Sequence, residues 1–136
     1  MNVLYPVFAM FVLTISVAMR LAALRYSAVS KGKVSGKFYE AYVGEEPEYL
    51  RVTARHLTNL LEIPVLFYIG CLLAFVTHQS GALIVGLAWA YVLLRVIHTL
   101  IHLGSNVVLT RFRVFALSVF VLVALWVTLF IGLAAR

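Results

Sequence analysis

The most constraining feature of the chain is a stretch from Ile63 to Leu94 that contains no Lys, Arg, Asp or Glu. One transmembrane helix needs only about 20 apolar residues, so this stretch is too long for a single span. The segment HQSGA at residues 78–82 provides a break within it. The sequence therefore predicts two transmembrane helices joined by a tight turn, which makes them antiparallel neighbours.

Two further apolar runs lie on either side of this pair, and the four helices are expected at residues 3–24, 47–77, 83–103 and 112–134. With 64% hydrophobic and 12% charged residues, the composition is outside the range of soluble domains. The first run has no basic segment before it, so we expect a retained span rather than a cleaved signal peptide. We predict an all-α integral membrane protein, a four-transmembrane-helix bundle that forms one domain over residues 1–136.

Lysine and arginine are distributed unevenly over the expected connections. The turn at residues 78–82 has neither, whereas the other two connections and their edges carry Arg25, Lys31, Lys33, Lys37, Arg51, Arg111 and Arg113. By the positive-inside rule these two connections face the cytoplasm and both termini lie on the other side, with Arg136 as a weak opposing charge. The net charge of +6 then reflects this asymmetry and attraction to membrane lipids, and no nucleic-acid partner is expected.

Polar and ionisable side chains recur at membrane depth on the second and third helices. At 100° per residue one face of the second helix collects Arg51, Arg55, Asn59 and Glu62, whereas His56 points elsewhere. The third helix carries a stripe of Arg95, His98 and His102. Because the two helices are neighbours, the stripes are expected to face each other, with Glu62 neutralising Arg95 or a protonated histidine.

Several functions are compatible with these stripes. One is a buried ion-pair cluster that only fixes helix packing. Another is a cationic, donor-rich pocket, in which arginine would bind a small anion or peptide carboxylates; its members would be Arg55, His98, His102 and Arg111. A zinc or iron site at His98, His102 and Glu62 is disfavoured by Arg95 one turn away, so no metal is expected. A proton pathway is disfavoured because the chain has no inverted repeat.

Two residues in the apolar runs have structural interpretations. Pro64 follows Ile63 within the second helix and is expected to kink it, which would open space beside Asn59 and Glu62. Cys71 is the single cysteine, so an intrachain disulfide framework is excluded, and we expect it to pack as a small buried hydrophobic residue.

The order and spacing of these polar residues resemble the MAPEG family, the membrane-associated proteins in eicosanoid and glutathione metabolism. The pattern R-x-x-x-N-x-x-E-x-P covers Arg55, Asn59, Glu62 and Pro64, and R-x-x-H covers Arg95 and His98. The resemblance extends over essentially the whole chain, and is strongest to the bacterial branch. It implies a homotrimer in the bacterial inner membrane, with glutathione bound between neighbouring subunits near the cytoplasmic side.

The resemblance also implies roles for individual residues. Arg55, Asn59, Arg95 and His98 match positions that hold glutathione, and Glu62 would orient the arginines. Arg111 lies where an arginine assists the thiolate, in keeping with the lowering of a thiol pKa by a nearby cation. Two positions depart from the pattern: Thr58 replaces a second basic residue, and His102 replaces a tyrosine that hydrogen-bonds the ligand.

We therefore hypothesise a glutathione-dependent transferase or peroxidase that acts on lipophilic electrophiles arriving through the bilayer. Arg111 would be the catalytic residue, and the cofactor, glutathione or a similar anionic thiol, would be bound by Arg55, Asn59, Glu62, Arg95, His98 and His102. The alternative is a non-enzymatic membrane protein whose Arg/Glu/His cluster is structural or binds another small anion.

Overall fold

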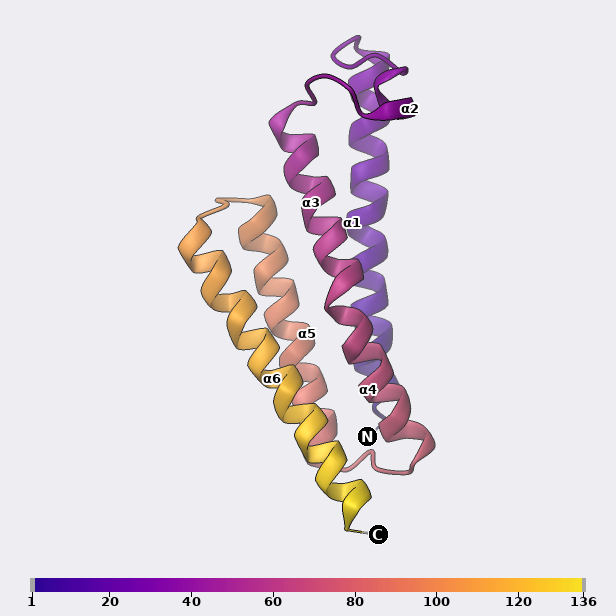
Figure 1. Cartoon of the computed structure of the whole chain (residues 1–136), viewed down its shortest axis with the longest axis vertical. Coiled ribbons are helices and arrows are strands. Elements are labelled where there is room, and N and C mark those ends of the chain that lie inside the picture. Colours follow the sequence, from indigo (N-terminus) through magenta and orange to yellow (C-terminus); the bar gives the residue numbers. More distant parts are fainter. Residues whose placement is uncertain (1, 136) are drawn as a thin grey trace.

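A computed structural model describes residues 2–135, so Met1 and Arg136, including the opposing charge expected at Arg136, lie outside the described residues. It shows the predicted four-helix membrane bundle (Figure 1). Each of the four spans is long and apolar enough to cross a membrane. They are α1 (Leu4–Ser30), α3 and α4 together (Glu48–Glu62 and Pro64–Val76), α5 (Ala82–Leu103) and α6 (Val108–Ala134). A short helix, α2 (Phe38–Ala41), lies in the loop between α1 and α3.

The helix ends differ from the expected ones where basic residues stand. The first helix was expected to end at residue 24 and the last to begin at 112, but α1 continues to Ser30 and α6 begins at Val108. Arginine is a good helix former and does not end a helix, so α1 continues past Arg25 to Ser30 and ends shortly before Gly32, which adopts a left-handed conformation with φ of 67°. In the second span the helix is divided at Ile63, because Pro64 has no N–H to donate.

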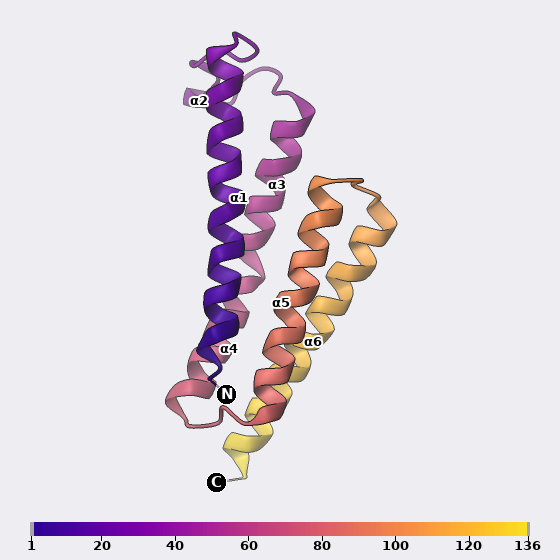
Figure 2. The same cartoon turned by 180° about the vertical axis from the view of Figure 1, so that it is seen from behind.

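The four spans lie side by side, and both ends of the chain lie at the same end of the bundle (Figures 1 and 2). Helix α1 packs against α3, α4 and α5, and α6 packs against α5 and α4. Apolar side chains from all four spans fill the core; among them are Met10, Phe67, Cys71, Tyr91 and Leu125. Cys71 is buried, as predicted. The outer faces are also apolar, which suits contact with lipid.

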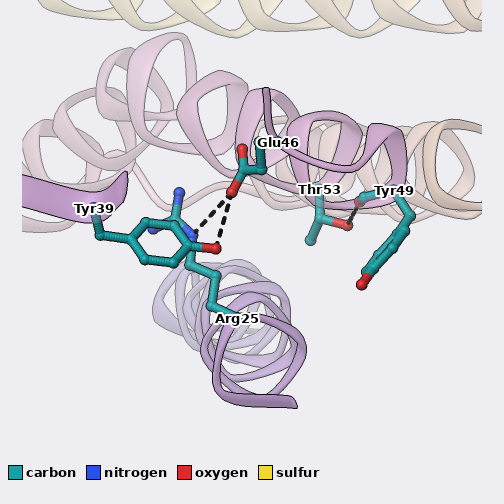
Figure 3. A network of polar contacts seen from close by, with 5 residues as sticks. All are labelled: Arg25, Tyr39, Glu46, Tyr49 and Thr53. Carbon is teal, nitrogen blue, oxygen red and sulfur yellow. Dashed lines mark hydrogen bonds and ion pairs between the residues drawn. The ribbon is translucent and has the colours of Figure 1, made fainter. Parts of the chain in front are cut away.

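At the opposite end of the bundle, α1, α2 and the start of α3 extend beyond the turn that joins α5 to α6 (Figure 1). A polar cluster holds these segments together (Figure 3). Arg25 of α1 pairs with Glu46, with 3.7 Å between Nε and Oε1, and the Tyr39 hydroxyl donates a hydrogen bond of 3.3 Å to the same carboxylate oxygen. The loop therefore folds back onto α1 rather than running free between the helices.

Candidate functional site

A cavity of about 400 Å³ lies between α3, α5 and α6. It brings together most of the side chains that the sequence singled out, since its lining includes Arg55, Asn59, Glu62, His98, His102 and Arg111. Thr58, at one of the two positions that depart from the family pattern, also lines it, together with Phe112 and Phe115. Arg51, which shares the predicted stripe, is exposed and does not line the cavity. The two stripes therefore face each other as predicted, with α6 closing the third side.

Arg95 lies behind the wall of this cavity rather than on its surface. Its side chain is fully buried, and Nη2 donates hydrogen bonds to the backbone oxygen of Asn59, at 3.1 Å, and to the Asn59 side-chain oxygen. The ring of Phe115 lies 5.6 Å from the guanidinium carbon. The Nε and Nη1 groups have no hydrogen-bond partner among residues 2–135. Arg95 is thus a buried cation whose donors are only partly used.

The expectation that Glu62 neutralises Arg95 or a protonated histidine is wrong, because Glu62 forms neither ion pair within the described part of the chain. Asn59 lies almost one helical turn before Glu62 on the same stripe, and it occupies the position facing the guanidinium. Glu62 remains exposed at the cavity. Helical periodicity placed both residues on the correct face, but it did not decide which of the two meets Arg95.

A buried histidine cluster lies next to Arg95. His56 of α3 is fully buried, and its ring centroid lies 5.4 Å from that of His98 and 4.7 Å from that of His102. Its Nε2 is 2.9 Å from the hydroxyl of Thr99, which itself donates to the backbone oxygen of Arg95 at 2.8 Å. His56 and Thr99 therefore tie α3 to α5 beneath the cavity.

Sequence reasoning missed His56 because it treated this residue as lying off the polar stripe. The buried residues of α3 show the signal that identifies it: they recur at helical spacing as Leu50, Thr53, His56 and Leu60. His56 thus belongs to the face of α3 that packs inward, beside the stripe that lines the cavity. A histidine on such a face needs a hydrogen-bond partner, and Thr99 provides it.

Asn106 holds Arg111 in place from the turn between α5 and α6. This asparagine adopts a left-handed conformation with φ of 50°, which asparagine tolerates better than most residues. Its side-chain oxygen accepts a hydrogen bond from Nη1 of Arg111. The sequence signal for this contact is local, since an asparagine in a short turn after Gly104 favours this backbone conformation.

The balance of charge makes the cavity attractive to anions. Arg55 and Arg111 line it and Arg95 lies directly behind it, whereas Glu62 is the carboxylate in the lining. Arginine binds carboxylates through its planar fork and stays charged in a poorly solvated site. Among residues 2–135 no group of three or more His, Cys, Asp or Glu side chains is arranged to hold a metal ion. The arrangement is suited to holding a small molecule that carries more negative than positive charge.

An apolar groove of about 400 Å³ adjoins the cavity along the second span and α6. It lies between the start of α4 and α6, and its lining includes Ile63, Leu66, Val119, Trp126 and Phe130. Ile63 directly follows Glu62, and Val119 lies about one turn after Phe115, so the groove begins where the cavity ends. A polar site and an apolar surface thus adjoin within one seam of the bundle.

The comparisons with known proteins identify the family of the chain. The sequence model of the MAPEG family matches residues 3–131, which is nearly the whole chain. No curated protein and no solved structure matches the chain significantly. The family resemblance inferred from the spacing of Arg55, Asn59, Glu62, Arg95 and His98 is therefore confirmed. The chain belongs to the MAPEG family.

Proposed function

We propose that this protein binds glutathione, or a similar anionic thiol, in the cavity between α3, α5 and α6. The thiol is then conjugated to a lipophilic electrophile, or used to reduce one. The observation that carries this proposal is the seam itself, in which a cationic cavity adjoins an apolar groove. Glutathione matches the cavity because it bears two carboxylates and one ammonium group, and the groove offers an apolar surface to a substrate that arrives through the bilayer.

The charge of each side chain determines which part of glutathione it binds in the proposal. Arg55 and His98 face the carboxylates of glutathione, while Asn59, held by Arg95, fixes the position of α3 against α5. The carboxylate of Glu62 lines the cavity, has no ion-pair partner among residues 2–135, and suits the ammonium group of the ligand. His102 offers a ring nitrogen where relatives use a tyrosine. These contacts bind and orient the thiol without taking part in bond making.

Arg111 is the catalytic residue of the proposal. The thiolate, not the thiol, is the nucleophile, and a nearby cation favours the thiolate. Asn106 holds the guanidinium of Arg111 near the N-terminus of α6, so that the positive charge of Arg111 stays beside the cavity. In a conjugation the sulfur lone pair forms the new carbon–sulfur bond, and the electron pair displaced within the electrophile takes up a proton.

The setting of the protein follows from its charges and its family. We infer a homotrimer in the bacterial inner membrane, with glutathione bound between neighbouring subunits. The basic residues support a cytoplasmic position for the end of the bundle that bears α2 and the α5–α6 turn, with both termini on the other side. The cavity then opens toward the compartment in which glutathione is abundant, while the groove lies at the depth of the lipid.

Isothermal titration of reduced glutathione into the purified protein in detergent tests the proposal. Arg55→Ala should weaken or abolish saturable binding, because Arg55 lines the cavity. Arg51→Ala is the matched control, since Arg51 lies one turn earlier on the same helix and is exposed outside the cavity. Equal losses in both variants would indicate nonspecific attraction to a basic surface.

The competing function is structural, and specific contacts favour it in part. Arg95 bonded to Asn59, and His56 bonded to Thr99, both join α3 to α5. If the unmodified protein shows neither heat of binding nor a thermal shift with glutathione, the cluster serves packing or another small anion. Titration with other small dicarboxylates would then separate these two outcomes.

A further inference from the structure

The hydrogen bonds around His56 fix which of its nitrogens carries hydrogen. A threonine hydroxyl has one hydrogen, and Thr99 donates it to the backbone oxygen of Arg95. Toward His56 the hydroxyl can therefore only accept, so Nε2 of His56 is the donor. In the neutral ring Nδ1 then carries a lone pair, and this atom is buried with no partner among the described residues.

The two neighbouring histidines, His98 and His102, also have a buried ring nitrogen without a partner in the described part of the chain. Nδ1 of His98 and Nδ1 of His102 are also buried without a hydrogen-bond partner among residues 2–135. The three ring centroids lie between 4.7 and 5.6 Å apart. Leaving a polar atom unpaired in a buried site is unfavourable, so a structural brace alone does not account for three of them.

We propose that His56, His98 and His102 form a proton-accepting cluster that takes the proton of the bound thiol, with His56 as the positioning residue behind the other two. This inference rests on the proposed function. The S–H bond breaks, its electron pair stays on sulfur, and the proton moves to a ring nitrogen of His98 or His102, which line the cavity. His56 holds its free lone pair beside these rings and stabilises the added proton.

The charges around the cluster determine where the proton goes next. Arg55 of α3 and Arg111 of α6 line the cavity with His98 and His102, and Arg95 of α5 lies behind it, so three positive charges repel an added proton; Glu62 of α3 is the carboxylate that lines the same cavity. The proton is therefore held only while the thiolate exists, and it returns to the electrophile once the carbon–sulfur bond has formed. Helix α4 brings no charged residue to the cluster, because its sequence contains none.

His102 also borders a second cavity, which gives the cluster a polar connection away from the thiol site. This cavity of about 400 Å³ lies between α1, α3 and α5, and its lining includes Arg20, Glu48 and Asn106. Glu48 stands at the first turn of α3, near the loop end of the bundle. His102 therefore borders both the thiol cavity and a polar-lined cavity on the side of α1.

The test measures the ultraviolet absorbance of the glutathione thiolate bound to the full chain as a function of pH. In His56→Gln the amide can still donate to Thr99, but it cannot accept a proton. The pH midpoint of thiolate formation should therefore rise by about one unit, which is a tenfold loss of thiolate at a fixed pH below it. Thr99→Val removes the brace but keeps the imidazole, so its midpoint should move much less.

Binding of S-methylglutathione, which has no thiol proton, separates the inference from the proposed function. It should bind the unmodified protein and His56→Gln equally well, and His56→Asn serves as a second variant with the same prediction. Equal midpoints in the unmodified protein and His56→Gln, or equal shifts in His56→Gln and Thr99→Val, overturn the proton-accepting role alone. Failure of the unmodified protein to bind either ligand overturns the proposed function and this inference together.

Discussion

Two arginines of this bundle differ in how their charge is compensated. Arg25, near the end of α1, pairs with Glu46 at 3.7 Å (Figure 3). Its guanidinium carbon also lies 5.1 Å from the ring centroid of Tyr39 and 5.9 Å from that of Tyr42. Its side chain keeps 29% of its surface exposed. Arg95, in the middle of α5, has no exposed surface and no carboxylate partner among the described residues.

The difference gives Arg25 a structural role and makes Arg95 a candidate for the proposed binding site. Removing a cation from water is costly unless a counter-charge accompanies it, and Arg25 obtains this counter-charge from its own chain. Within residues 2–135 Arg95 donates hydrogen bonds to the backbone and side-chain oxygens of Asn59 and lies over the ring of Phe115, while its Nε and Nη1 have no hydrogen-bond partner. In the proposed function, an anionic ligand in the adjoining cavity supplies the counter-charge that Arg95 lacks among the described residues.

The largest effect is expected from Arg95→Leu, which should change glutathione affinity and melting temperature in different ways. Loss of a buried cation beside the cavity should weaken glutathione binding by about a hundredfold, corresponding to roughly 2–3 kcal/mol for a charged interaction. The melting temperature in detergent should stay the same or rise, because an uncompensated buried charge is replaced by an apolar side chain. Titration calorimetry and a thermal-shift assay measure the two effects.

Arg25→Leu is the matched control for that prediction. It should lower the melting temperature, because Glu46 loses its partner while only 8% exposed, and it should leave glutathione affinity unchanged. If Arg95→Leu instead lowers the melting temperature and keeps its affinity for glutathione, the two arginines have the same structural role and the contrast between them disappears.

The next effect concerns turnover. Arg111→Ala should reduce the conjugation rate by about tenfold to a hundredfold, because the thiol pKa in the complex rises by about one to two units when the nearby cation is lost. Glutathione affinity should change little. Arg113→Ala is the control, since this arginine is exposed two residues later on α6 and does not line the cavity. Steady-state kinetics with a reactive aryl halide distinguishes the two variants, and an unchanged rate in Arg111→Ala removes this residue from the mechanism.

The fold could be predicted because a membrane leaves a chain few choices. Backbone groups in lipid have to be bonded within each segment, so a long uncharged run such as residues 63–94 forces two helices and a turn. The helix ends could be predicted less well: Arg25 and Arg111 were expected in the connections, but the helices include them. Charge marks the membrane edge, and a helix can continue past it.

The candidate site could be predicted only in part, for a physical reason. A helical period states which residues share a face, so Arg55, Asn59 and Glu62 were correctly grouped. It does not state how two helices are shifted along each other, and this shift decides that Arg95 meets Asn59 instead of Glu62. The burial of His56 likewise depends on the packing of α3 against α5, which no single-helix pattern contains.

A smaller effect is expected when the counter-charge of Arg25 is removed. Glu46→Gln should lower the free energy of unfolding by about 1 kcal/mol, since Arg25 is partly exposed and solvent screens the pair. The loop that carries Lys31, Lys33 and Lys37 should then be cleaved faster by trypsin. Glu45→Gln is the control, because Glu45 is exposed and makes no ion pair within the described chain. Equal cleavage rates in the two variants would show that the ion pair does not hold the loop.

The smallest expected effect is the pH-dependent contribution of Tyr39 to the free energy of unfolding. Burial, together with the carboxylate of Glu46, raises the pKa of Tyr39 above its ordinary value of 10.0. A group whose pKa is raised by folding stabilises the folded state fully below its unfolded pKa, and this contribution is lost as the pH rises through the folded pKa. Tyr39→Phe should therefore reduce stability by about 0.5 kcal/mol at neutral pH, the value of one modest hydrogen bond. Above pH 10 the difference in free energy of unfolding between the unmodified protein and Tyr39→Phe should narrow and vanish, as measured by unfolding at neutral and alkaline pH.

The control is Tyr26→Phe, at a side chain that is 79% exposed, which should show no such difference at any pH. A gap between the unmodified protein and Tyr39→Phe that stays constant across this range would mean that the phenol–carboxylate contact contributes nothing to the cluster around Arg25.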